Sequence, residues 1–244
     1  MNALETNDYT RAWAAMGARL ERATAILCIS AHWYLPRTLV TAMEKPRTIH
    51  DFGGFPAKLF EVEYAAPGSP SLARDVQSAL APFPVGLDRR WGLDHGAWSV
   101  LVHMRPRADI PVLQLSIDET QAPSFHYELG KRLAPLRDEG VLIVGSGNIV
   151  HNLEAYGWGA RTVDPYPWAT RFEHEARELI LGGRHGPLIE YSALGEDAML
   201  SVPTPDHYLP LLYVLGTRRD DEPVSFPVEG VDGGSISMLS VEIG

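Results

Sequence analysis

The sequence predicts a single α/β domain with a central, mainly parallel or mixed sheet, helices on both faces and an active site at the carboxyl ends of the strands. Short apolar runs alternate along the chain with segments whose apolar residues repeat at helical spacing. Such alternation indicates a parallel sheet that is covered on both faces. No internal repeat and no long linker divides the 244 residues, so residues 1–244 are expected to form one domain.

The first elements follow directly from apolar spacing. The stripe of Tyr9, Trp13, Met16 and Leu20 predicts a helix over residues 8–21. The apolar run at 25–29 predicts a buried strand that ends at His32. A second helical pattern predicts a helix over 71–80, for which Ser71 is the expected N-cap.

The second half of the chain continues the alternation. Gly182 and Gly183 close the last predicted helix, because glycine is typical of helix C-termini. The predicted elements are a strand at 111–116, a helical stripe at 125–136, a buried strand at 141–144, a helix at 168–181 and an irregular strand within 235–243.

Four long stretches between these elements are expected to be irregular: 33–58, 82–97, 145–168 and 195–207. Loops longer than about 12–15 residues are usually functional or disordered. These stretches are rich in Trp, Tyr, His and Pro, which favours ordered walls of a cleft over disorder.

Composition excludes several classes of partner. A net charge of −10 argues against nucleic acid and anionic membrane surfaces, which require clustered Lys and Arg. The sequence contains no apolar run long enough to span a membrane and no signal-peptide pattern at its start. The single cysteine forms no internal disulfide, so a cytoplasmic location is expected.

Histidines next to predicted strands and turns are the strongest chemical signal. His32 and His151 follow apolar runs, and His207 follows a Thr-Pro-Asp helix start that favours a neutral imidazole. Each is either a metal ligand, a base or a histidine bonded to a loop, and local context alone leaves these alternatives open. His95 lies between two tryptophans beside Asp94, and either contacts a substrate oxygen or only packs.

Other catalytic motifs are absent from the sequence. It contains no Gly-x-Ser-x-Gly elbow, Walker loop, Gly-x-Gly-x-x-Gly after a strand, Cys-x-x-Cys or His-Glu-x-x-His. A serine hydrolase is therefore a poor explanation of this chain.

Six motifs together resemble the class III extradiol ring-cleavage dioxygenases, specifically the 4,5-DOPA dioxygenase-like branch. The resemblance extends from residue 1 to the segment at 237–241. The motifs are Ser-Ala-His-Trp (30–33), Thr-Ile-His-Asp-Phe-Gly-Gly-Phe-Pro (48–56), Leu-Asp-His-Gly-Ala-Trp (93–98), Ser-Gly-Asn-Ile-Val-His-Asn (146–152), Pro-Tyr-Pro-Trp-Ala (165–169) and Pro-Thr-Pro-Asp-His-Tyr-Leu-Pro (203–210).

The resemblance implies a catalytic domain over 1–244 that opens a DOPA-like catechol with O2 by means of non-haem Fe(II). Zn(II) is the alternative ion that the same site can hold in place of iron. His32 and His207 resemble metal ligands. His151 resembles the base that removes a catechol proton, or it approaches the metal itself, and His95 resembles a histidine that contacts substrate or O2. Further residues in these motifs are expected to face the substrate: His50, Asn152 and Trp168.

The chain departs from the family pattern at its start. Family members carry a strand and a Gly-His-Gly-Ser-Pro turn ahead of the segment that matches residues 1–4, and that turn supplies a further metal histidine. We therefore expect reduced metal occupancy and activity, whether the start is assigned too late, the chain is truncated or the strand is naturally lost. A non-catalytic binding protein on the same scaffold and a zinc-dependent hydrolase are the alternatives. The catechol and the oligomeric state are left open.

Overall fold

The computed structural model describes residues 2–20, 22–159 and 163–244. Residue 1, residue 21 at the end of the helix predicted over 8–21, and the part of the predicted loop that falls on 160–162 lie outside the described residues. The strands are β1 (Ala25–Leu35), β2 (Thr38–Thr41), β3 (Val85–Asp88), β4 (Val112–Asp118), β5 (Val141–Ser146), β6 (Val224–Val228), β7 (Val231–Asp232), β8 (Ile236–Ser237) and β9 (Ser240–Ile243). The helices are α1 (Asp8–Arg19), α2 (Ala57–Phe60), α3 (Pro70–Ala79), α4 (His95–Met104), α5 (Pro123–Leu133), α6 (Pro167–Leu181), α7 (His185–Ile189), α8 (Glu196–Ser201) and α9 (Leu209–Gly216), with 3-10 turns at Asn2–Leu4, Ala134–Glu139 and Tyr191–Leu194.

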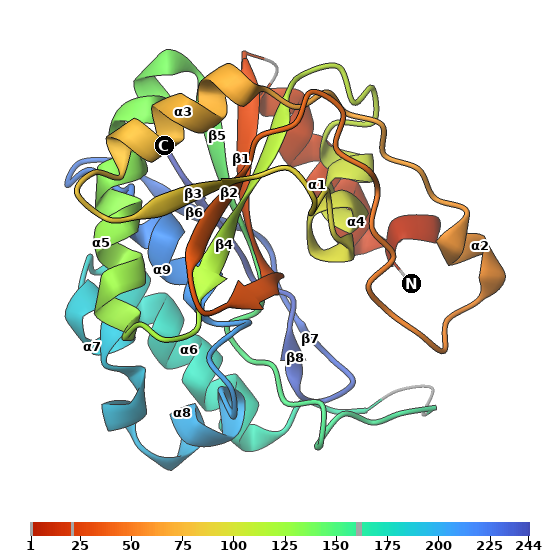
Figure 1. The fold of residues 1–244 in the computed structure, drawn as a ribbon. Coiled ribbons are helices and arrows are strands. Elements are labelled where there is room, and N and C mark those ends of the chain that lie inside the picture. The colour runs from red at the N-terminus through yellow and green to blue at the C-terminus, as the bar shows by residue number, and fades with distance from the viewer. Residues whose placement is uncertain (1, 21, 160–162) are drawn as a thin grey trace.

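A five-stranded mixed sheet forms the centre of the fold, in the order β3-β2-β4-β1-β5 (Figure 1). β1 pairs in parallel with both β4 and β5, β2 pairs in parallel with β3, and β2 runs antiparallel to β4. The predicted α/β class with a mainly parallel or mixed sheet is confirmed. Two small antiparallel pairs, β6–β9 and β7–β8, lie outside this sheet.

Helices cover both faces of the sheet, as predicted. One face carries α3, α5 and α9, which pack on Leu27 and Ile29 of β1, and the other carries α1 and α4, which pack near Ile26 (Figure 1). Successive strand residues point to opposite faces, so one apolar strand supplies both cores. An all-apolar run such as the start of β1 is therefore what a strand between two helical layers requires.

Most predicted elements are confirmed, with corrected ends. β1 does not end at His32, as predicted, but continues to Leu35. Ser69, and not Ser71, caps α3, because its side chain accepts the backbone N–H of Leu72 while Pro70 occupies the first helical turn. The predicted irregular strand at the end of the chain is split into β8 and β9, which pair with different partners.

Three of the stretches expected to be irregular contain regular elements. β2 lies within 33–58, β3 and the start of α4 lie within 82–97, and α8 lies within 195–207. The two strands have four residues each and α8 has six, which is too short for a periodic pattern to be recognised. α4 and α9 are apolar around most of their surface because they are buried, and they therefore lack a clear polar face.

β5 is an edge strand, although its apolar sequence predicts a buried one. Leu142, Ile143 and Val144 are only half-buried, because no strand pairs with the side of β5 that faces away from β1 among the described residues. A groove of about 530 Å³ runs along this edge, between β5, β9, α1 and α9, and reaches His207 at one end.

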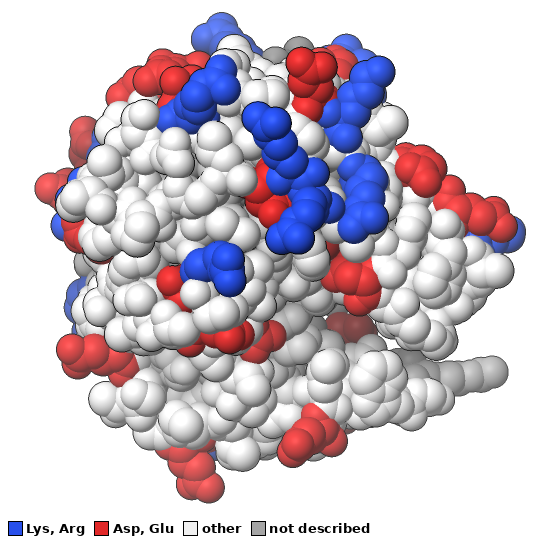
Figure 2. Space-filling view, in the orientation of Figure 1, with Lys and Arg blue, Asp and Glu red and all other residues white. Residues whose placement is uncertain are grey.

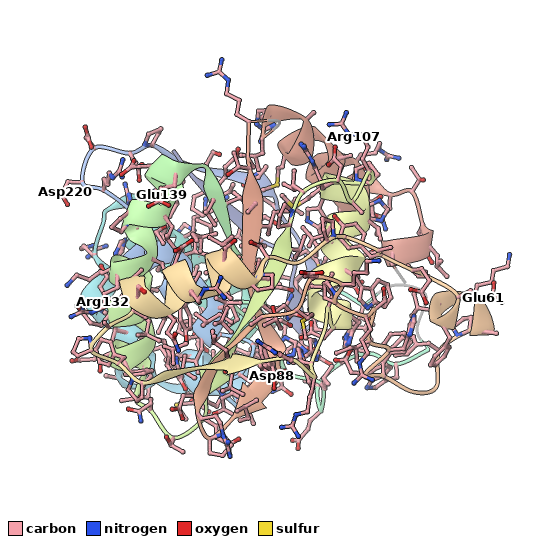
Figure 3. The ribbon with its side chains drawn as sticks, turned by 45° about the horizontal axis from the view of Figure 1, so that its top comes forward. Glu61, Asp88, Arg107, Arg132, Glu139 and Asp220 are labelled. Atoms are coloured by element: carbon pink, nitrogen blue, oxygen red, sulfur yellow. The ribbon has the colours of Figure 1, made fainter. Side chains whose placement is uncertain are left out.

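Charged side chains lie on the outside of this framework. Glu139 and Asp220 are exposed at the rim of the molecule, whereas the guanidinium of Arg132 lies over the Phe83 ring (Figure 3). In the space-filling view, Lys and Arg gather in the upper half of one face, and a hollow opens below them between the projecting α2 segment and the part of the chain beneath it (Figure 2).

His126 on α5 makes the stability of this core depend on pH. It is buried, its Nδ1 lies 2.9 Å from the hydroxyl of Tyr213, and burial lowers its pKa to about 4. Since the folded pKa lies below the unfolded value of 6.5, the contribution is fully present above pH 6.5 and is lost as the pH falls towards 4. The loss amounts to about 3 kcal/mol at most.

Replacing His126 with asparagine is expected to flatten this part of the stability curve, because the variant has no imidazole to protonate. Urea unfolding at neutral pH and near the lowered pKa measures the difference between variant and wild type. His174→Asn is the control, since His174 is an exposed histidine on α6. Equal pH slopes in all three proteins would show that His126 is not the group responsible.

Candidate active site

His32 lies at an irregularity of β1. The register between β1 and β4 shifts between Ile29 and Tyr34, so the segment that carries His32 is not paired with β4. The hydroxyl of Ser30 accepts the backbone N–H of His32 at 3.3 Å. Such irregularities redirect side chains and are frequent next to active sites. The predicted strand-to-site transition is therefore present within β1, not after it.

A buried carboxylate underlies the site. Asp94 is fully buried and accepts hydrogen bonds from the hydroxyl of Ser30 at 2.7 Å and the side-chain amide of Gln114 at 2.8 Å. It is also the N-cap of α4, where its side chain accepts the N–H of Ala97. These bonds satisfy the buried carboxyl group and fix where α4 begins. His95, the first residue of α4, is thereby placed beside His32, with ring centroids 3.9 Å apart.

Gly96 is required for this close approach. A Cβ at Gly96 would lie 2.8 Å from Cδ2 of His32 and closer still to the Ser30 hydroxyl. Gly96→Ala is therefore expected to displace His32 and to cost about 1–3 kcal/mol of unfolding free energy, as overpacking does. Chemical unfolding and a Zn(II) titration measure the two effects.

Gly186→Ala is the matched control for this prediction, because nothing lies within 4 Å of the Cβ position at Gly186. If Gly96→Ala binds Zn(II) as tightly as the control does, His32 has not moved and the steric argument is wrong.

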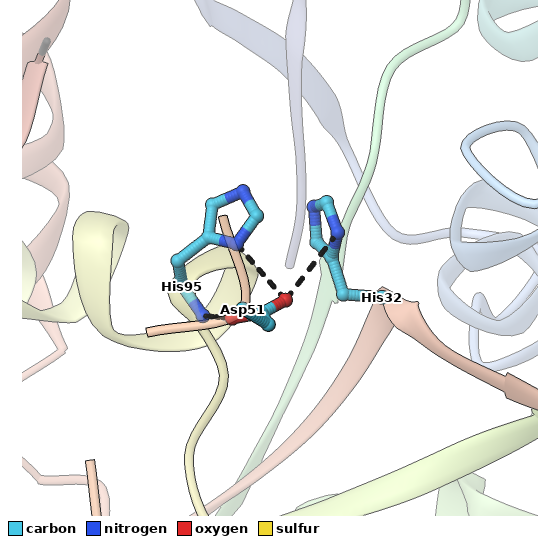
Figure 4. A group of neighbouring side chains, drawn as sticks. All are labelled: His32, Asp51 and His95. Carbon is cyan, nitrogen blue, oxygen red and sulfur yellow. Dashed lines mark hydrogen bonds and ion pairs between the residues drawn. The ribbon is translucent and has the colours of Figure 1, made fainter. Parts of the chain in front are cut away.

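Asp51 joins His32 and His95 into one group (Figure 4). Its Oδ1 accepts the backbone N–H of His95 at 2.9 Å, and its Oδ2 lies 3.0 Å from Nδ1 of His95 and 3.6 Å from Nδ1 of His32. The three side chains offer donor atoms that all lie within 4.8 Å of one another, as a metal site requires. Burial raises the pKa of Asp51, but the close His95 side chain and the backbone N–H of His95 outweigh this effect, and the pKa of Asp51 lies below its ordinary value.

His151 and His207 form the other half of the cluster. Their rings are stacked, with centroids 3.5 Å apart and planes 2° from parallel. Nδ1 of His207 lies 3.1 Å from the side-chain oxygen of Asn148, so this nitrogen donates and Nε2 carries the lone pair, with Oδ2 of Asp206 3.8 Å away. Among the described residues the ring of His151 has no hydrogen-bond partner, which leaves it available to accept a proton.

The two halves meet at His32 and His207, whose ring centroids are 5.2 Å apart and whose planes are perpendicular. Burial is the main cause that lowers the pKa of His32, of His151 and, most strongly, of His207. Neighbouring imidazoles add to the effect on each of them. The lowered pKa values favour the neutral form of these three imidazoles near pH 7, which is the form that binds metals and accepts protons.

Aromatic rings line one side of this cluster. Phe52 contacts His95 edge-on with ring centroids 5.2 Å apart, and it also packs against Phe60 at 4.8 Å. Trp98 lies behind them, fully buried, and donates its indole N–H to the carbonyl of Ile49. A small planar ring would find apolar contacts here and polar groups at the histidines, which is the usual composition of a small-molecule site.

The residues predicted to face a substrate are spread more widely. Nε2 of His50 lies 3.0 Å from the carbonyl of Val62, with the ring inside the aromatic group. Asn152 is buried and donates to the carbonyl of Leu200, while its oxygen accepts the N–H of Ala155. The Trp168 ring is half-buried and stacks on Tyr166 at 5.5 Å. Substrate contact by these three stays a prediction.

Sequence reasoning missed Asp51. The motif that contains it was noted for His50 and for the aromatic loop that follows. The available signal was an acidic residue in a segment rich in site residues, because histidines in metal sites are usually oriented by a carboxylate or carbonyl.

Comparisons with known proteins agree on one family. A model described as the catalytic LigB subunit of aromatic ring-opening dioxygenase matches residues 4–233. The chain is 53% identical to a 4,5-DOPA dioxygenase extradiol of Escherichia coli (strain K12), over 100% of this chain and 91% of that protein. It is 39% identical to a 4,5-DOPA dioxygenase extradiol of Beta vulgaris, over 88% of this chain and 81% of that protein.

A solved structure shares the fold of this chain. The crystal structure of an uncharacterized protein of Escherichia coli K12 superimposes with a TM-score of 0.87 at 48% identity, covering 99% of this chain and 94% of that chain. Within the described residues, no helix combines the length and the apolar character needed to cross a membrane.

Proposed function

Because the chain belongs to the family of the catalytic LigB subunit of aromatic ring-opening dioxygenases, we propose that it opens a DOPA-like catechol with O2 at its histidine cluster, using a bound metal. The observation that carries this proposal is the convergence of four imidazoles from distant segments: His32, His95, His151 and His207. The names of the relatives support a DOPA-like substrate.

The residues present fit a non-haem metal. His32 and His207 are the proposed ligands, because burial favours their neutral form, because their rings are perpendicular and 5.2 Å apart, and because the Asn148 contact leaves the lone pair of His207 on Nε2. Imidazole nitrogen suits both Fe(II), the ion proposed for catalysis, and Zn(II). When bound, such an ion supplies Lewis-acid polarisation of the two catechol oxygens and of O2.

His151 is the proposed base. Its ring is held against His207, so a catechol oxygen near the ligands lies within its reach. Burial lowers its pKa, and the neutral ring therefore has a lone pair ready for the hydroxyl proton of the substrate. Removing that proton makes the aromatic ring of the catechol electron-rich, and ring opening by O2 requires this.

His95 and the aromatic residues are proposed to hold the substrate. Phe52 and Phe60 offer apolar edges to a planar ring and limit the access of water to the histidines. His95 lies between Phe52 and His32, where it would meet a substrate oxygen or O2. His50, Asn152 and Trp168 are kept as proposed substrate contacts at the edge of this region.

Oxygen uptake tests the function. Protein loaded with Fe(II) is expected to consume O2 when a DOPA-like catechol is added, whereas protein loaded with Zn(II) is expected to consume none. Ester hydrolysis by the Zn(II) form without oxygen uptake by the Fe(II) form would point to the hydrolase and contradict the proposal. Catechol binding without either reaction would favour a non-catalytic binding protein. The expected weakening of the metal site stays a prediction, which the affinity for Fe(II) tests.

A further inference from the structure

We propose that Asp51 is a positioning residue that fixes the tautomer of His95 and, more weakly, of His32, so that both imidazoles present Nε2 to the site. The proposed function gives Asp51 no task, and the consequence of this role for turnover rests on that function. The role itself is a property of the metal-free protein.

The two oxygens of Asp51 have different partners. Oδ1 accepts the backbone N–H of His95, which is a free donor because His95 is the first residue of α4. Oδ2 is thereby directed at the side chains, 3.0 Å from Nδ1 of His95 and 3.6 Å from Nδ1 of His32. The side chain of Asp51 is only 19% exposed, so its carboxylate is largely shielded from water although its backbone lies at the surface.

An ionised carboxylate only accepts hydrogen bonds, and therefore the nitrogen that faces it must carry a hydrogen. Nδ1 of His95 is buried and has no aligned hydrogen-bond partner within the described part of the chain. The 3.0 Å contact between this nitrogen and Oδ2 is therefore close but not an aligned hydrogen bond. Catalytic hydrogen bonds are often bent in this way before substrate binds and tighten afterwards. With Nδ1 protonated, Nε2 is the atom left for the metal or the substrate.

Asp51→Asn is a sharp probe of this role. The amide oxygen can replace Oδ1 as acceptor for the backbone N–H of His95, which preserves the link between the loop and α4. The amide NH₂ then faces Nδ1 of His95 and donates, so Nδ1 must accept and the hydrogen must move to Nε2. The variant therefore inverts the tautomer while changing almost nothing in shape.

Asp88→Asn is the matched control. Asp88, at the end of β3 (Figure 3), also accepts backbone N–H groups through Oδ1, from Arg90 and Trp91, and it contacts no imidazole among the described residues. Asp88→Asn therefore measures the effect of losing a carboxylate that only supports a loop.

The experiment is ¹⁵N NMR of the histidine rings in metal-free protein, with a His95→Gln variant to assign the signal. We expect the His95 signal of the wild type and of Asp88→Asn to show Nδ1–H, and that of Asp51→Asn to show Nε2–H. A Zn(II) titration is the second readout, and we expect about 10–100-fold weaker binding in Asp51→Asn alone, as for loss of an outer-shell partner. An unchanged affinity for Zn(II) in Asp51→Asn would show that Asp51 does not position His32.

An unchanged His95 tautomer in Asp51→Asn overturns the proposal. If Zn(II) binding is also lost entirely, Asp51 is itself a metal ligand together with His32 and His95. Neither readout involves oxygen uptake, so Asp51 can fail this test while the ring-opening function stands, and the function can fail while Asp51 passes.

Discussion

Replacing His151 with glutamine is expected to lower the rate of catechol ring opening by about 10²–10⁴-fold, the usual contribution of a positioned base. Glutamine retains a polar group of similar reach but accepts no proton near neutral pH. The ring of His151 rests on His207, and among the described residues it contacts no hydrogen-bonding partner that the substitution would leave unpaired. The loss is therefore expected in kcat, with a smaller change in KM.

Initial rates of O2 uptake over a range of catechol concentrations separate the two constants. His174→Gln is the control, because His174 is an exposed histidine on α6. This variant is expected to turn over substrate at the wild-type rate. A His151→Gln protein with wild-type kcat would remove His151 from the role of base. Retained kcat with a large rise in KM would make it a substrate-binding residue instead.

Replacing His207 with asparagine is expected to abolish tight metal binding and, with it, activity. His207 is one of two proposed ligands, so its loss should exceed the about 10–100-fold cost of losing an outer-shell partner. Calorimetric titration of the metal-free protein with Zn(II) measures this effect without any turnover. His32→Asn is expected to behave in the same way, because the two rings meet at the proposed metal position.

His174→Asn again serves as the control and should bind Zn(II) as the wild type does. If His207→Asn binds with wild-type affinity while Asp51→Asn does not, the metal lies in the group of His32, Asp51 and His95. That result would replace His207 by Asp51 and His95 in the ligand set and would contradict the ligand role of His207.

The architecture could be predicted from the sequence because the long helices each bury one face, whereas β1 is buried on both. The stripe around Trp13 and the apolar run at the start of β1 both required a covered sheet, and the structure has them so. The short strands β2 and β3 could not be predicted, since four residues show no period. β5 was misjudged because its sequence does not say which of its sides lacks a neighbouring strand.

The candidate site was predicted in its residues but not in its geometry. His32, His95, His151 and His207 were identified individually, and the structure brings them together. Sequence could not show that His151 stacks on His207, because that contact depends on how the segment after β5 meets the start of α9. It also could not show that Asp51, in the loop before α2, reaches the first turn of α4.

Mass spectrometry of the product formed from a DOPA-like catechol under ¹⁸O₂, with Fe(II)-loaded protein, tests the central claim most directly. The account predicts a ring-opened semialdehyde that retains every carbon of the substrate and carries newly incorporated ¹⁸O, with one O2 consumed for each catechol. Intact catechol after prolonged incubation, or a quinone with no incorporated label, would contradict it.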